Sequence, residues 1–304
     1  MNTATAAASV SGTPASSRAF VSPAALDWAV LALPGLIWGT SFLLIAEGLA
    51  AVPPDGITFL RFVIGFLTLS LVPAARQPVR TGDRAGIAWL GVIWLALPMS
   101  MFPHAEQHVS SALTGMLNGA VPLIAGAVAT VISRQAPGRA VVVALTVGFG
   151  GAVLMAAPGL SSGGNSSLGV VLILVALVSY GVAINLARPL QQRNGALPVV
   201  WRALGVAMVL TAPLGVRALT QAEWHLRPML AILALGVLGT AAANVLMALA
   251  AGRLGATRAS GTTFLIPVVA LVLGVIVRGE TVPVLAIGGS ALCLAGAWLM
   301  RRAK

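Results

Sequence analysis

Charged residues are scarce in this chain, and their scarcity limits the class of protein to which it can belong. Only 8% of the 304 residues are Asp, Glu, Lys or Arg, whereas 58% are hydrophobic and the mean hydropathy is +0.98. Soluble globular domains carry about 25% charged residues. A soluble domain is therefore excluded, and the composition is that of a protein that crosses a membrane several times.

Cysteine and signal-peptide features are also lacking. The single cysteine, Cys293, lies in a long apolar run, so no intrachain disulfide can form and no redox chemistry is indicated. Residues 1–25 are rich in Ala, Ser and Thr and lack the apolar core of a signal peptide. We expect them to form a disordered cytoplasmic tail.

Long apolar runs dominate the rest of the chain. A membrane-spanning helix needs about 20 apolar residues, and ten segments meet this requirement. The sequence therefore predicts an all-α membrane protein with ten transmembrane helices, near residues 26–49, 57–73, 85–102, 109–133, 140–157, 168–187, 197–216, 228–250, 255–277 and 282–300.

The basic residues lie singly or in pairs between these segments. They form no patch with interleaved aromatic residues, so nucleic acid is not an expected partner. If the N-terminus is cytoplasmic, 14 of the 18 Lys and Arg residues fall on that side, three (Arg217, Arg227 and Arg278) on the other, and Arg61 within a segment. The positive-inside rule then predicts a multi-pass inner-membrane protein with both termini in the cytoplasm.

Several landmarks recur at similar spacings in two halves of the chain. Asn118 precedes Pro122 by four residues, as Thr263 precedes Pro267, and Trp38 precedes Arg61 by 23 residues, as Tyr180 precedes Arg202 by 22. Gly-Ala-x-Leu-Met follows each of the two prolines by 29 residues, beginning at positions 151 and 296. We interpret residues 26–158 and 168–301 as two copies of one five-helix unit.

Five crossings per unit have a consequence for topology. Because five is odd, the second copy enters the membrane inverted. Inverted repeats are typical of secondary transporters, which bind solute near the middle of the membrane between the repeats. This architecture predicts alternating access of a site between the two halves.

Local motifs in both halves of the chain are Leu-Ile-Trp-Gly-Thr-Ser at 36–41, Phe-Leu-Arg-Phe at 59–62, Ala-Glu-Gln-His-Val-Ser-Ser at 105–111, and Gly-Ala-Thr-Arg-Ala at 255–259 with Gly279-Glu280. They resemble motifs of the EamA family of the drug/metabolite transporter superfamily. The resemblance covers almost the whole chain and implies a ten-helix carrier similar to the YddG-type amino-acid exporters. Ser133-Arg134 stands where the family often has Gly-Glu.

Four residues are candidates for gating. Pro122 and Pro267 lie inside apolar segments, where a proline removes a helix hydrogen bond and neighbouring helices absorb the cost. Arg61 is a charge within a segment and therefore a functional candidate. Glu47 is its expected partner, and the pair either fixes the ends of the first two helices or forms an outer gate.

A second set of residues shares a depth near the middle of the membrane. Aromatic walls with a few polar groups suit a small amphiphilic solute, although each residue alone could serve only helix packing. The predicted substrate-binding residues are Trp38, Ser41, Trp94, Asn118, Tyr180, Asn244 and Thr263.

No Asp or Glu is expected at mid-membrane depth. Ion-coupled carriers usually need one, or a set of unwound carbonyls. We therefore expect gradient-driven export of a neutral or zwitterionic amino acid or related metabolite, with proton-coupled export of other metabolites or cationic drugs as the alternative. The expected partners are this solute and the lipid bilayer, and the expected state is a monomer.

His104, Glu106 and His108 cluster between the third and fourth segments. Their spacing lacks the convergent ligands of a metal site, so we expect a solvated external vestibule and neither metal nor cofactor. An embedded enzyme would need reactive groups at one depth, and all three histidines fall near the outer face, so no enzyme is expected. A passive channel remains a lesser alternative.

Overall fold

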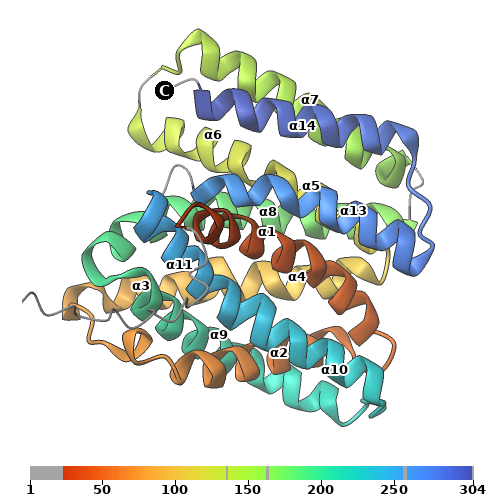
Figure 1. Cartoon of the computed structure of the whole chain (residues 1–304). Helices are drawn as coiled ribbons and strands as arrows, with labels where there is room; N and C mark the ends of the chain where they lie inside the picture. Colours follow the sequence, from red (N-terminus) through yellow and green to blue (C-terminus); the bar gives the residue numbers. More distant parts are fainter. Residues whose placement is uncertain (1–22, 135, 162–163, 256–258, 303–304) are drawn as a thin grey trace, which may run out of the picture.

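The computed structural model describes residues 23–134, 136–161, 164–255 and 259–302. Within these residues it is built of helices and contains no strand. The predicted tail, apart from 23–25 at the start of the first helix, lies outside them. The helices pack alongside one another as a bundle (Figure 1), in agreement with the predicted all-α fold.

In the part of the chain that the structure describes, the helices form ten consecutive rods, each close to a predicted segment. In chain order, the elements are α1 (Pro23–Gly48), α2 (Pro54–Ser70), η1 (Pro73–Arg76), η2 (Thr81–Asp83), α3 (Arg84–Leu90), η3 (Gly91–Ala96), α4 (Leu97–Glu106), α5 (Ser111–Leu117), η4 (Asn118–Ala120), α6 (Val121–Ser133), α7 (Arg139–Ser161), α8 (Gly164–Asn194), α9 (Ala196–Leu219), α10 (Leu226–Ala234), η5 (Leu235–Ala242), α11 (Ala243–Leu254), η6 (Ser260–Phe264), α13 (Leu265–Arg278) and α14 (Val284–Arg302).

Not every rod has the length of a membrane crossing. Among the described residues, eight helical stretches are long and apolar enough to cross a membrane, and Val284–Met300 is a shorter apolar helix. The remaining rod, α2, has 17 residues and includes Asp55 and Arg61. The count of ten crossings therefore stays a prediction.

Four rods are interrupted, and the interruptions come in pairs. The third and eighth rods each contain a π-helical stretch, η3 and η5. The fourth and ninth rods each contain a 3-10 stretch, η4 and η6, shortly before Pro122 and Pro267. The helix breaks expected at the prolines are thus present, and they occupy matching places in the two halves of the chain.

Contacts between the halves follow the same pairing. α7 packs on α14, α2 on α9, and α5 on α13. The contact of α4 with α8 is matched by that of α1 with α10 and α11, and the contact of α9 with η3 by that of α2 with η5. Two copies of one unit would produce these relations.

The end of α6 corrects one detail of the sequence comparison. Arg134 has φ 53° and Gly279 has φ 64°, so each ends its helix in the left-handed region. Both lie twelve residues after the proline of their rod. Arg134 therefore corresponds to Gly279, and Gln135, outside the described residues, corresponds to Glu280. The match of Ser133-Arg134 with Gly-Glu was wrong by one residue.

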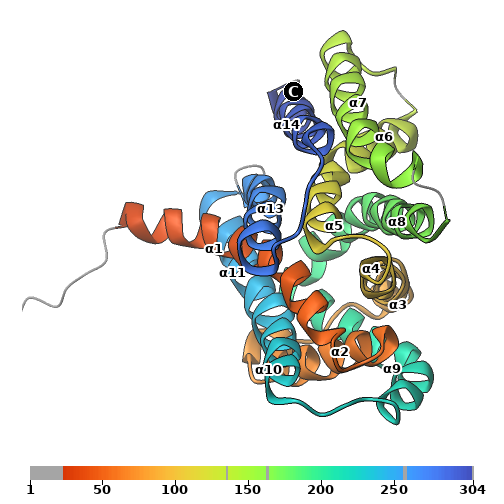
Figure 2. The same cartoon turned by 90° about the vertical axis from the view of Figure 1, so that its right-hand side faces the viewer.

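Glycines bring α7 and α14 into backbone contact at one edge of the bundle, where Figure 2 shows the two helices side by side. A Cβ at Gly289 would lie 2.7 Å from the carbonyl oxygen of Gly151 and 2.8 Å from the Met155 nitrogen. A Cβ at Gly296 would meet the backbone of Gly148. Small residues allow this approach where lipid provides no hydrophobic drive for association.

The adjacent glycines of α14 give a matched test of this packing. Gly289→Ala should lower the free energy of unfolding by about 1–3 kcal/mol, because its methyl group must push two backbones apart. Gly288→Ala should leave the free energy of unfolding unchanged or raise it by up to about 1 kcal/mol. A Cβ at Gly288 would have no atom of another helix within 4 Å among the described residues, and alanine favours the helix. Thermal unfolding in detergent measures both, and equal midpoints would contradict the assigned contact.

Candidate functional site

The two π-helical stretches are met by side chains from the opposite half of the chain. Trp38 Nε1 on α1 donates to the carbonyl oxygen of Gly239 in η5 at 3.1 Å. Ser179 Oγ on α8 donates to the carbonyl oxygen of Ile93 in η3 at 2.5 Å. A π-helix shifts the backbone hydrogen-bond pattern and is common at functional sites. The predicted residue Trp38 is therefore positioned against the π-helical stretch between α10 and α11.

Arg61 reaches the same π-helical stretch from α2. It is only 5% exposed, and its Nε donates to Thr240 Oγ1 at 2.9 Å. Thr240 Oγ1 in turn donates to the carbonyl oxygen of Leu235 at 3.2 Å. The terminal guanidinium nitrogens have no hydrogen-bond partner among the described residues. The prediction that Arg61 pairs with Glu47 is wrong, because the Arg61 side chain points into the bundle toward η5.

An aromatic row runs beside this polar group. The rings of Phe42 on α1 and Phe102 on α4 meet edge to face with centroids 5.6 Å apart. Phe102 also stacks on Tyr180 of α8 with centroids 5.9 Å apart. Tyr180 was a predicted site residue, whereas Phe42 and Phe102 were missed, because their sequence positions do not distinguish them from ordinary core residues.

The other predicted residues are placed less centrally. Ser41 is buried beside Trp38, and its hydroxyl donates to the carbonyl of Ile37 in its own helix at 3.1 Å. Asn244 donates to the carbonyl of Thr240 at 2.6 Å, one turn earlier in the same rod. Trp94 packs in a separate core formed mainly by α2, α3, α8 and α9. Their contacts are those expected from helix packing.

Asn118 and Thr263 lie at the two helix breaks. Asn118 is half-buried at the start of η4, and Thr263 Oγ1 donates to the carbonyl of Ser260 within η6 at 2.8 Å. The breaks themselves pack together, because a Cβ at Gly119 would lie 2.7 Å from Pro267 Cγ. The structure thus brings Pro267 next to the break that precedes Pro122.

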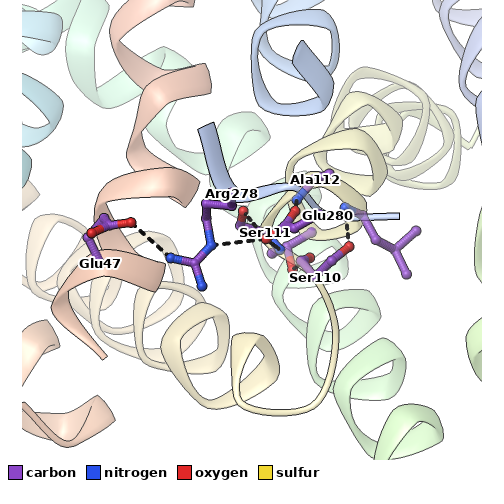
Figure 3. Close-up of polar contacts among 8 residues, drawn as sticks. Glu47, Ser110, Ser111, Ala112, Arg278 and Glu280 are labelled. Atoms are coloured by element: carbon purple, nitrogen blue, oxygen red, sulfur yellow. Dashed lines mark hydrogen bonds and ion pairs between the residues drawn. The ribbon is translucent and has the colours of Figure 1, made fainter. Parts of the chain in front are cut away.

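One end of the bundle is fastened by ion pairs and hydrogen bonds, which we call the Glu47–Glu280 network (Figure 3). Glu47 pairs with Arg227 at 2.7 Å and with Arg278 at 3.0 Å, and Arg278 pairs with Glu280 at 3.2 Å. The network thereby joins the ends of α1, α10 and α13.

Glu280 extends the network to α5. Its carboxylate accepts from the Ser111 nitrogen at 3.1 Å, the Ser111 hydroxyl at 2.7 Å and the Ala112 nitrogen at 2.8 Å. A carboxylate at the N-terminus of a helix satisfies free N–H groups and is favoured by the helix dipole. The motif Gly279-Glu280 was noted in the sequence, but the helix that it caps could not be identified there.

The cluster of His104, Glu106 and His108 does not form the expected solvated vestibule. His104 Nε2 lies 3.0 Å from Asp55 Oδ1, with both side chains partly exposed. Both carboxylate oxygens of Glu106 are instead buried and have no hydrogen-bond partner among the described residues. Helix α4 turns Glu106 inward, one turn beyond Phe102.

Both halves of the chain match a known family of proteins. Residues 28–157 and 167–302 each match the EamA-like transporter family. A probable terminal-alkyne amino-acid exporter from Streptantibioticus cattleyicolor is 28% identical, over 90% of this chain and 93% of the relative. The uncharacterized transporter YoaV of Bacillus subtilis is 24% identical, over 87% and 92%.

A solved crystal structure shares the fold, with a TM-score of 0.59 and 19% identity over 90% of this chain and 94% of the other. The match to known transporters extends through both halves, as do the paired helix breaks. This chain belongs to the EamA-like transporter family.

Proposed function

We propose that this protein exports amino acids or related small metabolites across the inner membrane by alternating access. The observation that carries the proposal is that Trp38 and the buried Arg61 both reach η5, while Trp38 and Tyr180 pack against one core that includes Phe42 and Phe102. Such surroundings suit a small amphiphilic solute. The similarity to a probable amino-acid exporter supports the same class of solute.

The proposed arrangement has two inverted units, residues 26–158 and 168–301, with both termini in the cytoplasm. The paired interruptions and the paired contacts between the halves support the units. The distribution of Lys and Arg, 14 against three, supports the orientation. The Glu47–Glu280 network then lies on the outer side and serves as the outer gate, with a monomer as the working unit.

A buried acidic side chain bears on how export is coupled to an ion gradient. The preference for gradient-driven export relied on the expected lack of Asp and Glu at mid-membrane depth, whereas the structure contains one buried carboxylate without a hydrogen-bond partner among the described residues, that of Glu106. A buried carboxylate also favours the alternative solutes, cationic drugs, because it can bind a cation. Exchange of cations with no exchange of amino acids would select that alternative.

Counterflow in proteoliposomes tests the function. Vesicles preloaded with unlabelled threonine, methionine or an aromatic amino acid should accumulate the labelled solute with saturable kinetics. Trp38→Leu should raise the half-saturation concentration about tenfold, because it removes an aromatic face worth about 0.5–1.5 kcal/mol and the bond to Gly239. Trp28→Leu is the control, because Trp28 lies on the same helix and is 71% exposed.

The same assay can contradict the proposal. Flux that rises linearly with concentration would indicate a channel, and no exchange of any amino acid would exclude the proposed solutes. Equal kinetics of Trp38→Leu and the unmodified protein would remove Trp38 from the site.

Glu280→Gln tests the outer gate. Glutamine at this position carries no negative charge, so its bonds to the three donors of α5 should be weaker and α13 should separate from α5 more often. Thr114 is fully buried one turn inside it, and Thr114→Cys in a Cys293→Ser background reports opening through reaction with an impermeant thiol reagent. We expect labelling to accelerate at least tenfold.

Glu223→Gln is the matched control for this experiment. Glu223 pairs with His225 before α10, and its side chain is 77% exposed, so its loss should leave the labelling rate unchanged. Identical rates in the two variants would show that Glu280 does not hold the gate.

A further inference from the structure

We propose that Arg61 and Glu106 form a two-point site for a zwitterion, in which Arg61 binds the α-carboxylate of the solute and Glu106 binds its α-ammonium group. The inference rests on the proposed function and names the chemistry by which that site would select its substrate. It uses two buried charges that come from helices α2 and α4 and that the bundle leaves without ionic partners.

Arg61 is prepared for a carboxylate. Its Nε is held by Thr240, which fixes the plane of the guanidinium, and its terminal nitrogens have no partner among the described residues. A guanidinium in this state offers two parallel N–H groups, which match the two oxygens of a carboxylate. Glu47 does not compete for them, because Arg227 and Arg278 hold it.

Glu106 is prepared for a cation. Both of its oxygens are buried and accept no hydrogen bond, and burying an unpaired charge is costly. Among the described residues, no basic side chain forms an ion pair with it. Arg278 is already bound to Glu47 and Glu280, and Glu280 repels a carboxylate. An ammonium group would supply both the charge and the missing donors.

The two side chains come from helices that lie against each other: His104 Nε2 on α4 lies 3.0 Å from Asp55 Oδ1 on α2, and Thr58 Oγ1 on α2 donates to the Met99 carbonyl oxygen on α4 at 3.4 Å. Among the described residues, no hydrogen bond joins Arg61 to Glu106. Tyr180 lies within reach of the Arg61 charge and stacks on Phe102. Phe102 precedes Glu106 by four residues on α4, so the two side chains share one face of that helix. A zwitterion placed here would present its carboxylate to α2, its ammonium group to α4, and its side chain to the aromatic row.

This arrangement predicts selection by both charges at once. A molecule with a carboxylate alone would leave Glu106 unpaired, and a molecule with an amine alone would leave Arg61 unpaired. Sites with buried polar groups reject analogues that leave those groups without partners.

The test uses methionine as the probe, in two measurements on the purified full-length protein. The first is counterflow competition by methionine, by its deaminated analogue 4-(methylthio)butanoate and by its decarboxylated analogue 3-(methylthio)propylamine. The second is thermal stabilisation by methionine in detergent, which reports binding without transport. The unmodified protein should bind methionine at least a hundredfold more tightly than either analogue.

Two variants assign the contacts. Glu106→Gln should weaken the binding of methionine at least thirtyfold and leave the affinity for the deaminated analogue unchanged, so that the two affinities become similar. Arg61→Gln should likewise weaken the binding of methionine and leave the affinity for the decarboxylated analogue unchanged. Arg61→Lys should restore part of the affinity for methionine. Arg202→Gln, on α9 at the matching landmark of the other half, and the exposed Glu223→Gln are the controls and should not alter either ratio.

The outcomes separate this inference from the function on which it rests. Saturable counterflow with unchanged methionine affinity in Glu106→Gln and Arg61→Gln would overturn the zwitterion site and leave the exporter. Methionine binding that depends on both residues, with no counterflow, would overturn the exporter and leave the site. A loss of pH dependence in Glu106→Gln, with unchanged analogue ratios, would make Glu106 a proton site and overturn the present assignment.

Discussion

The structure depends on one constraint: a backbone polar group that is removed from water must be satisfied inside the protein. The π-helical stretches η3 and η5 disturb the regular helical ladder in the third and eighth rods. Ser179 and Trp38 donate to one carbonyl oxygen in each stretch. Each half of the chain thus completes the interrupted helix of the other. This exchange holds α1 against α10–α11 and α8 against α3–α4.

Charge is distributed by a related rule. A charge near the middle of a membrane is expensive, so it is paired or functional. At one end of the bundle, Glu47 and Glu280 use all their oxygens in contacts with arginines and with the first turn of α5. Farther inside, Arg61 is satisfied in part and Glu106 not at all. The contrast separates charges that join the ends of helices from charges that are left without an ionic partner among the described residues.

The sequence predicted the helices well, because hydropathy and length alone define them, and it predicted both breaks from Pro122 and Pro267. It could not predict which charges meet. Glu47 lies at the end of α1 and Arg61 near the middle of α2, and the rotation of α2 turns Arg61 toward Thr240. Glu106 sits in a polar stretch that suggests solvent, and only the path of α4 shows that it is buried. The π-helical stretches have ordinary apolar sequences, so the role of Gly239 and Thr240 was invisible without tertiary contacts.

The left-handed residues Arg134 and Gly279 place Gln135 and Glu280 at corresponding positions. Glu280 brings a full negative charge to the positive end of a neighbouring helix, whereas a neutral amide at the corresponding position cannot. The two halves of the chain are therefore alike in their helix breaks but unlike in the charge that follows them in the sequence. Separating α13 from α5 must break charge-assisted bonds to the Glu280 carboxylate, so this contact resists separation more strongly than an apolar contact of the same size.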